Sequence, residues 1–355
     1  MQRTLVLRPQ KGVFYSRNDI FRAMGLQGTV IRTIFQTATS FGAAFDTLCQ
    51  VSGIRPEEIS DSENMVEWEK AALIWVPLLK MTSDPLIGLH VGMGTEKLLH
   101  GMVGFLIQSS KDLHQANNIL SKYGHLVSPM VEYKYAVKDV AILEMVQNKM
   151  WLMKHPESAR HAQDFLIASL VNTSSALTAR RIIPIRIELA YERRAVDEYQ
   201  NFFGCDILFN KETNRIILDK KDMKIPILTS DQSMFERFNA MIDEKQALMT
   251  GSSTEGNLKQ VLFMQFKGRI PSVDEAASAL QMTSRSLQRK LLREQTTFRD
   301  VAGAVRKDIA LQLMQNPAIK ISEVSDILGY SDPTAFRKAF KSWTNAVPRT
   351  IRKSA

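Results

Sequence analysis

Two stretches near the C-terminus repeat one pattern: a helix start, a short apolar helix, a tight turn and a second, basic helix. In the first stretch, Ser272 and Glu275 have the spacing of a capping box, and Thr283 can cap the helix that follows. In the second, Asp332 followed by Pro333 is a strong helix start. Two short helices, a tight turn between them and a polar, basic second helix are typical of a helix-turn-helix, so the sequence predicts two such units.

A longer helix is predicted between the two units, over Phe298–Gln315, because its apolar residues recur at helical spacing. At 1.5 Å per residue this helix is about 25 Å long. Major-groove faces on one side of B-DNA are about 34 Å apart, so such a helix can space two reading helices one turn apart. The sequence therefore predicts an all-α domain over residues 259–355 that contacts two adjacent major grooves of double-stranded DNA.

The second helix of the first unit has the side chains that a base reader needs. Arg285 and Arg289 can offer bidentate donors to guanine, and Gln288 can pair with adenine. For each outward side chain the alternative is an ordinary solvated surface residue. The neighbouring polar and basic residues are expected to meet phosphates, which fix register without reading sequence. These expected phosphate contacts are Ser286, Lys290, Arg293, Ser331, Lys341 and Arg349.

The charge of the chain supports this assignment because of where it lies. The net charge is +9, from 46 Lys and Arg against 37 Asp and Glu. Residues 1–255 hold 29 of each kind, whereas residues 256–355 hold 17 basic and 8 acidic residues. The whole excess is therefore in the last hundred residues, which indicates a polyanion partner for that part alone. The alternative is a basic domain that is merely soluble.

Residues 259–355 resemble the DNA-binding domain of the AraC/XylS family of bacterial transcription regulators. The resemblance is carried by Thr283–Leu291, by Ile321 and Val324, and by the run Gly329–Lys341. It implies base-reading positions at Arg285, Gln288 and Arg289 in the first unit and at Thr334, Arg337 and Lys338 in the second. The sequence departs from the family at Lys338, where arginine is usual, and at Asn345, where glycine is usual. Lysine is a point donor and changes the expected bases, while asparagine still tolerates a left-handed helix end.

The neutral residues 1–235 are predicted to form an α+β domain, joined by a linker at 236–258 whose end, Thr250–Asn257, is small and polar. The whole chain is thus expected to be mostly α. The predicted helices are Thr29–Cys49, Asn64–Leu79, Lys111–Val127 and Pro156–Arg180. The predicted strands are Val131–Val137 with Val140–Val146 as a hairpin, Arg181–Ala190, and Asp206–Asn210 with Asn214–Asp219 as a second hairpin.

No catalytic, metal or cofactor site is predicted. The six histidines lack a zinc-helix spacing, and no phosphate loop or nucleophile elbow is present in the sequence. The glycines of Gly88–Gly94 do not fit a dinucleotide fingerprint and are expected in a turn between packed helices. The 17 methionines either line an adaptable pocket or fill the core, and core filling is favoured. Cys49 and Cys205 cannot make a disulfide framework, which favours a reducing cytoplasm.

A second resemblance covers the N-terminal part. Asp84–Gly92, Gly101 with Gly104, and Ile187–Tyr191 through Phe202–Gly204 with Phe209 resemble the large "arabinose-binding-like" domain of one AraC-family branch. The resemblance implies an effector-sensing domain and identifies neither the effector nor its pocket residues. It also implies a homodimer, although no coiled-coil repeat predicts one.

The sequence thus predicts a DNA-binding transcription regulator that is not an enzyme and is gated by a small molecule. The alternative keeps the DNA binding and gives residues 1–235 a protein partner or a constitutive role in dimerisation. RNA polymerase is a further expected partner, a membrane is not, and the expected location is the cytoplasm, at the nucleoid. Activation is the expected direction, although the sequence itself leaves activation and repression open.

Overall fold

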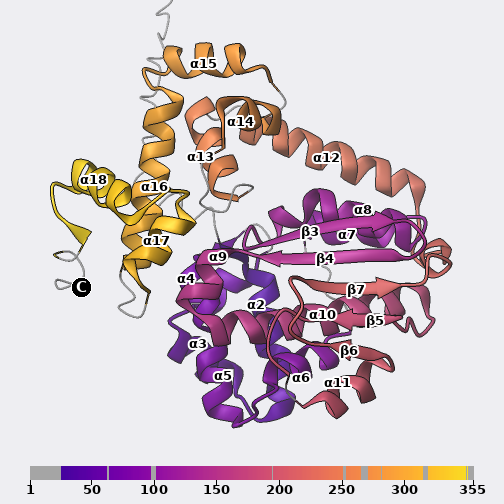
Figure 1. The fold of residues 1–355 in the computed structure, drawn as a ribbon. Coiled ribbons are helices and arrows are strands. Elements are labelled where there is room, and N and C mark those ends of the chain that lie inside the picture. The colour runs from indigo at the N-terminus through magenta and orange to yellow at the C-terminus, as the bar shows by residue number, and fades with distance from the viewer. Residues whose placement is uncertain are drawn as a thin grey trace, which may run out of the picture.

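The structure is a computed structural model that describes residues 25–61, 64–96, 101–193, 195–250, 253–264, 271–280, 282–314, 319–348 and 350. The N-terminal part combines a sheet with many helices, and the C-terminal part is helical (Figure 1). This is the mostly α architecture, with an α+β N-terminal part, that the sequence predicts.

A five-stranded sheet in the order β3-β4-β7-β5-β6 organises the N-terminal part. Its strands are β3 (Val131–Val137), β4 (Ala141–Gln147), β5 (Arg186–Glu188), β6 (Asp206–Leu208) and β7 (Asn214–Leu218). Strands β3 and β4 form the predicted antiparallel hairpin, in which Val131 is opposite Gln147. A separate two-stranded sheet joins β1 (Leu26–Gln27) to β2 (Met65–Val66).

The second predicted hairpin is wrong. Strands β6 and β7 do not pair with each other, because β5 lies between them, parallel to β6 and antiparallel to β7. The turn-forming residues between β6 and β7 suggested a direct connection, but the neighbours of a strand are chosen by tertiary packing. The predicted strand over Arg181–Ala190 is also shorter than expected, because only Arg186–Glu188 forms it.

The helices of the N-terminal part lie behind and beside this sheet in the view of Figure 1. The α-helices are α2 (Gly28–Ala38), α3 (Phe45–Ser52), α4 (Trp68–Leu73), α5 (Trp75–Thr82), α6 (Ile87–Gly94), α7 (Gly101–Ser109), α8 (Leu113–Tyr123), α9 (Lys149–Lys154), α10 (Pro156–Thr178) and α11 (Val196–Phe203). The short 3₁₀ helices are η1 (Thr39–Phe41), η2 (Pro56–Ile59), η3 (Gly124–Leu126) and η4 (Asp222–Lys224).

Two of the predicted long helices are interrupted. The stretch Thr29–Cys49 contains α2, η1 and α3, because Gly42 adopts a φ of 87° and ends the first helical run. The stretch Asn64–Leu79 begins with β2 and then divides into α4 and α5 at Ile74. Apolar periodicity continues across both breaks, since the residues on either side face one core, and periodicity alone does not locate a break.

Helix α10 is the central helix of the N-terminal part, and α6 packs closely against it. The segment Gly88–Gly94, predicted as a turn, is instead the greater part of α6. A Cβ atom on Gly88 would lie 2.1 Å from the carbonyl oxygen of His161, and one on Gly92 would lie 2.6 Å from that of Phe165. These glycines therefore serve backbone-to-backbone contact between two helices, a demand that only the folded chain reveals.

A buried polar network lies on the same helix. The side chain of Asp164 is fully buried, lies 3.2 Å from the Arg160 guanidinium and accepts a hydrogen bond from the hydroxyl of Tyr191. Burial, and then the Asp164 charge, raises the pKa of Tyr191 well above its ordinary value. The pairing compensates the carboxylate for lost hydration and ties the segment that follows β5 to α10.

Helix α12 (Gln232–Thr250) leads from the N-terminal part towards the C-terminal helices (Figure 1). The C-terminal helices are α13 (Thr254–Met264), α14 (Val273–Ala279), α15 (Ser284–Arg293), α16 (Phe298–Met314), α17 (Ile321–Ile327) and α18 (Pro333–Thr344). Helix α13 begins inside the stretch expected as a linker, and its Leu258 and Leu262 are fully buried. The C-terminal core therefore starts at α13, before residue 259.

Within the described residues, no single helix has both the length and the apolar composition needed to cross a membrane. Helices α4 and α5 reach that threshold only when taken together with α6, across a bend of 96°.

Candidate nucleic-acid interface

The first helix-turn-helix unit is built from the caps that the sequence predicts. The Glu275 backbone N–H donates to the Ser272 hydroxyl at 3.2 Å, and the Ser272 N–H donates to the Glu275 carboxylate at 2.7 Å. Thr283 caps α15 by accepting from the Ser286 N–H at 3.2 Å. The Ser284 hydroxyl also donates to Asp274, which ties the start of α15 to α14.

The second unit uses a stronger cap. The Asp332 carboxylate accepts from the backbone N–H groups of Thr334 at 2.7 Å and Ala335 at 3.0 Å, at the start of α18. These hydrogen bonds, led by the one from Ala335, hold the pKa of Asp332 below its ordinary value. Gly329 (φ 72°) and Asn345 (φ 55°) both adopt the left-handed conformation that the sequence predicts for them.

The apolar faces of the two basic helices are fixed in the core. Leu287 and Leu291 on α15 and Phe336 and Phe340 on α18 are all fully buried. The predicted connecting helix is present as α16, with α15 near one end and α17 and α18 near the other (Figure 1). The Arg306 guanidinium of α16 lies 5.1 Å from the centre of the Tyr330 ring, which helps hold the second unit on α16.

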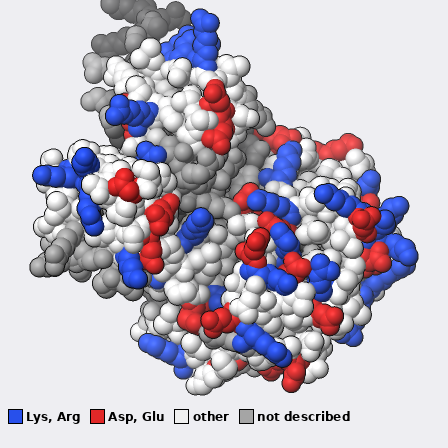
Figure 2. All heavy atoms as spheres, in the orientation of Figure 1, with Lys and Arg blue, Asp and Glu red and all other residues white. Residues whose placement is uncertain are grey.

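All six predicted base-reading side chains are exposed, on α15 and on α18. Arg285 and Arg289 are one helical turn apart, as are Thr334 and Lys338, so each set shares a helix face. In Figure 2, basic atoms gather over α15 and again over α18. Both faces point away from the buried leucines and phenylalanines, so they are free to enter a groove.

The predicted phosphate contacts are placed less uniformly. Lys290, Arg293, Ser331 and Lys341 are exposed, whereas Ser286 is half-buried. Arg349 lies outside the described residues.

One contact that the sequence did not predict joins α15 to the linker. Glu294, the residue that ends α15, accepts hydrogen bonds from the backbone N–H groups of Thr254 at 2.7 Å and Glu255 at 2.8 Å. Its carboxylate therefore caps α13 from a distance of about 40 residues along the chain. An acidic residue at the end of a basic helix is the only sequence signal for this contact.

The described residues contain no group of three or more His, Cys, Asp or Glu side chains able to hold an ion. His90 lies between two carboxylates, with Nδ1 2.5 Å from Asp84 and Nε2 3.3 Å from Glu198. His90 and Glu198, together with Arg181, are the charged or titratable residues that line an open cleft of about 460 Å³ between α6, α10 and α11. The cleft is a candidate place for a charged small molecule.

Comparison with known proteins identifies the family. A family model described as "Arabinose-binding domain of AraC transcription regulator, N-term" matches residues 42–227, more than half of the chain. A helix-turn-helix domain model matches residues 276–354. The chain belongs to the AraC family of transcription regulators.

Several relatives share most of its length. The chain is 23% identical over 325 residues to the ornithine utilization regulator of Pseudomonas aeruginosa, covering 90% of this chain and 94% of that protein. It is 22% identical over 330 residues to an uncharacterized HTH-type transcriptional regulator of Mycobacterium tuberculosis, covering 89% and 93%. Among solved structures, the transcriptional regulator CdpR from Pseudomonas aeruginosa matches with a TM-score of 0.39 and 19% identity, covering 87% of this chain and 96% of that one.

The chain is therefore a DNA-binding transcription regulator of the AraC type with an arabinose-binding-like N-terminal domain. Its family consists of transcription regulators rather than enzymes. The name of the N-terminal family model describes the family and does not assign a ligand to this chain.

Proposed function

We propose that this regulator reads promoter DNA through α15 and α18, and that a small molecule in its N-terminal domain changes that reading. The DNA-reading part rests on one observation. Each helix has a row of exposed polar side chains on the face opposite a row of fully buried apolar side chains. The core thus fixes each helix, while the exposed row remains available to bases. The proposed readers are Arg285, Gln288, Arg289, Thr334, Arg337 and Lys338.

Substitution of one proposed reader tests base recognition. Bound sites are first selected from random DNA in vitro, and affinity is then measured on a selected site and on unrelated DNA. Arg289→Ala is expected to weaken binding to the selected site by about 1–3 kcal/mol and to relax preference at one base pair. Arg299, an exposed arginine of α16 outside both reading rows, serves as the matched control through Arg299→Ala. An equal loss on both DNAs would refute base reading by Arg289.

The gating part is supported by the way α12 is held. The Phe105 ring of α7 stacks on Phe238 of α12, with ring centroids 5.2 Å apart. The Tyr123 hydroxyl of α8 is 2.9 Å from Asp243 Oδ1, and Ile242 is fully buried against α7 and α8. Helix α12 leads in turn to α13, whose first turn is bound by the residue that ends α15. A shift of α7 or α8 would therefore act on α12, and α13, the next helix along the chain, is held to the end of α15 by Glu294.

Gating requires that the effector prefer one of two states of this path. Removing the Tyr123 hydroxyl as Tyr123→Phe is expected to reduce the effector-dependent change in DNA affinity while leaving effector binding in place. Tyr191→Phe is the matched control, because it also removes a buried hydroxyl bonded to a carboxylate but lies away from α12. An unchanged response in Tyr123→Phe would argue against transmission through this contact.

A protein partner is the second candidate for the N-terminal domain. Exposed apolar side chains lie on and near α7 and α12, namely Phe105 (52% exposed), Met241 (50%) and Leu228 (69%). Such residues suit either a second copy of the chain or another protein, RNA polymerase among them. Analytical ultracentrifugation of the wild type and of Met241→Glu distinguishes a dimer through this surface from a monomer.

A thermal-shift screen identifies the effector class. L-ornithine and L-arabinose belong in that screen because of the names of the relative and of the family model. A ligand at 100 times its dissociation constant adds about 2.7 kcal/mol of stability, which is readily measured.

A further inference from the structure

Two small, mostly apolar cavities lie next to each other in the N-terminal domain, along one face of α10. The first has a volume of about 60 Å³ and lies between α10, α7 and α8; the second, of about 70 Å³, lies between α10, α2 and the α4–α5 pair. Leu170, Ser174 and Leu177 of α10 line the first, and Ala162 and Leu166 line the second. These residues recur at helical spacing, so a single stripe of α10 runs along both cavities.

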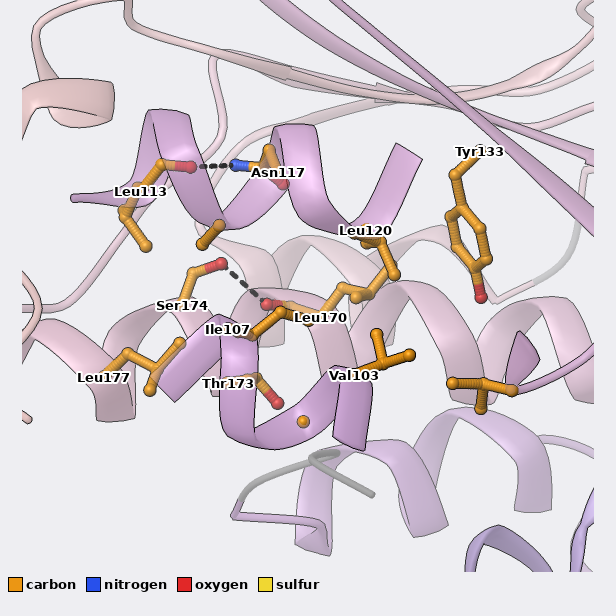
Figure 3. Close-up of a pocket in the computed structure, with 13 residues that line it drawn as sticks. Val103, Ile107, Leu113, Asn117, Leu120, Tyr133, Leu170, Thr173, Ser174 and Leu177 are labelled. Carbon is orange, nitrogen blue, oxygen red and sulfur yellow. Dashed lines mark hydrogen bonds between the residues drawn. The ribbon is translucent and has the colours of Figure 1, made fainter. Parts of the chain in front are cut away.

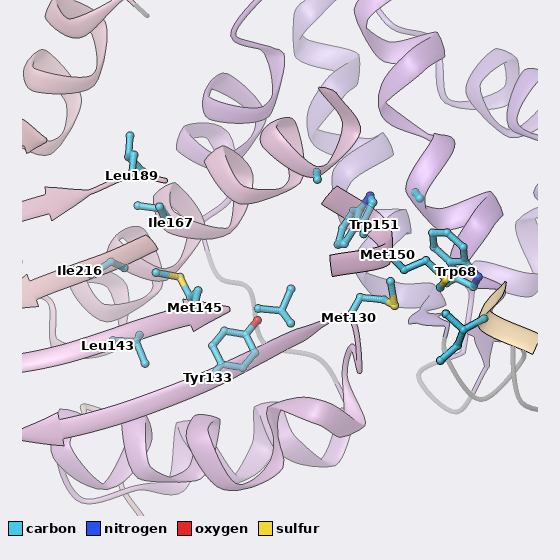
Figure 4. Close-up of a cluster of buried hydrophobic side chains, with 14 of the residues drawn as sticks. Trp68, Met130, Tyr133, Leu143, Met145, Met150, Trp151, Ile167, Leu189 and Ile216 are labelled. Atoms are coloured by element: carbon cyan, nitrogen blue, oxygen red, sulfur yellow. The ribbon is translucent and has the colours of Figure 1, made fainter. Parts of the chain in front are cut away.

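Tyr133 of β3 stands between the two cavities. It lines both, and Val127 is the other residue that their linings share. In Figure 3 its ring leaves β3 and carries the hydroxyl at its far end, beside the first cavity. Figure 4 shows the same ring near Met130, with Trp151 and Trp68 of the second cavity beyond. The ring fits here because it lies over Gly124, where a Cβ atom would approach to 2.5 Å.

The Tyr133 hydroxyl has no hydrogen-bond partner among the described residues, although the residue is 8% exposed. Burial raises the pKa of this phenol, so it stays a neutral donor and acceptor. The other polar groups nearby are engaged: Ser174 donates to the Leu170 carbonyl at 2.9 Å, and Asn117 donates to the Leu113 carbonyl at 2.9 Å. Because this hydroxyl faces a cavity and has no protein partner, it is available to bind a ligand oxygen.

The indole N–H of Trp68, in the lining of the second cavity, also lacks a partner within the described residues. No charged side chain lines either cavity. A charged ligand would therefore lose its hydration without compensation, and a sugar would leave most of its hydroxyls unpaired. The linings suit a ligand that has one or two oxygen atoms near its middle and a hydrocarbon group on each side of them.

From these contacts we propose that the paired cavities are the effector site and take a small neutral molecule, such as a ketone or an ester, whose oxygen hydrogen-bonds to Tyr133. This proposal rests on the proposed gating function and names the ligand class for it. Joined by a small movement of the Tyr133 ring, the cavities approach the roughly 150 Å³ of an engineered cavity that binds benzene. The first cavity is lined by Val103, Gly104 and Ile107 of α7, so its filling acts directly on the helix that holds α12.

The test uses symmetric ketones as probes with the full chain. Binding of 3-pentanone, 4-heptanone and 5-nonanone is followed by tryptophan fluorescence and thermal shift, since Trp68 and Trp151 line the second cavity. Affinity is expected to rise about fourfold for each added methylene group until the cavities are full. Hexanoate and glucose are expected not to bind. Tight binding of hexanoate that is lost in Arg181→Ala would place the ligand in the open cleft that Arg181 lines and overturn the proposal.

The variant Tyr133→Phe distinguishes the contribution of the hydroxyl to ligand binding from that of the aromatic ring. It is expected to weaken ketone binding about tenfold and to leave toluene binding unchanged, because toluene needs only the apolar wall. The ligand-free variant is expected to be as stable as the wild type or more stable. Tyr135→Phe is the matched control, since that hydroxyl lies 3.1 Å from His114 and outside both linings. Equal ketone affinity in wild type and Tyr133→Phe, or a destabilised ligand-free Tyr133→Phe, would overturn the proposal.

The site and the gating function fail in different ways. If ketones bind through Tyr133 but leave the affinity for a selected DNA site unchanged, the proposed ligand site is supported and the proposed gating is refuted. If another compound changes the affinity for DNA and no ketone binds, the proposed gating is supported and the proposed ligand site at Tyr133 is refuted.

Discussion

The carboxylate of Glu294 is the structural link between the linker and the first reading helix, and Glu294→Ala tests it. The side chain is half-buried and accepts hydrogen bonds from two backbone N–H groups at the start of α13, at 2.7 Å from Thr254 and 2.8 Å from Glu255. Among the described residues these two N–H groups have no other acceptor, so the substitution leaves both dependent on water.

The expected magnitude follows from the kind of bond. Removing a helix N-cap destabilises a helix by about 0.5–2 kcal/mol, and hydrogen bonds to a charged group contribute about 1.5–3 kcal/mol each. Partial exposure of Glu294 reduces the charge contribution. We therefore expect α13 to open more readily by about 1.5 kcal/mol, which corresponds to about tenfold faster amide exchange. Glu294→Gln keeps one oxygen acceptor without the charge, so its effect should be about half as large.

Hydrogen exchange measured by mass spectrometry on peptides that cover α13 provides the assay. Glu323→Ala is the matched control, because the Glu323 carboxylate caps α17 through the Lys320 N–H at 2.6 Å and does not contact α13. It should accelerate exchange in α17 and leave α13 unchanged. Unaltered exchange of α13 in Glu294→Ala would refute the reasoning that this carboxylate holds the linker to the reading helix.

Three further predictions follow from particular contacts. Lys341→Ala should weaken binding to all DNA sequences alike and lower the slope of log affinity against log salt by about one unit, as titrations at several salt concentrations would reveal. Hydrogen bonding depresses the pKa of Asp332, so its cap should stabilise α18 above about pH 4 and lose this effect as the pH falls through the lowered pKa. Amide hydrogen exchange of α18, measured at pH 5 and at pH 3, should show this loss in the wild type. Asp332→Asn should not show it. Gly88→Ala should destabilise the protein by about 1–3 kcal/mol in urea unfolding, since its Cβ meets the His161 carbonyl, whereas Gly303→Ala, in open space on α16, should stabilise it by about 0.5–1 kcal/mol. A stable Gly88→Ala protein would contradict the close contact between α6 and α10.

Signals within a few residues of one another decided much of the C-terminal part. The capping box of Ser272 and Glu275, the cap at Thr283 and the cap at Asp332 each bind backbone groups no more than three residues away. Such bonds form wherever the local chain is helical, so their residues can be recognised without a fold. The exposed rows on α15 and α18 follow from the same periodicity, because buried and outward residues alternate by the helical repeat.

Contacts between residues far apart in the chain could not be predicted from the sequence. Insertion of β5 between β7 and β6, closure of α6 onto α10, and the cap that Glu294 places on α13 all join segments that local patterns treat as independent. Each depends on which surfaces meet, and many sequences with the same local pattern meet differently. The candidate ligand site shows this most clearly: alternation along Val131–Val137 predicted a strand, but only the packing of α10, α7 and α8 around it leaves the Tyr133 hydroxyl beside a cavity. The sequence by itself thus determined two helix-turn-helix units that follow an α+β part, because local bonds and periodicity specify helices and strands. The tertiary structure decided how the two parts are joined and where a ligand fits, because cavities and long-range caps exist only once distant segments are packed together.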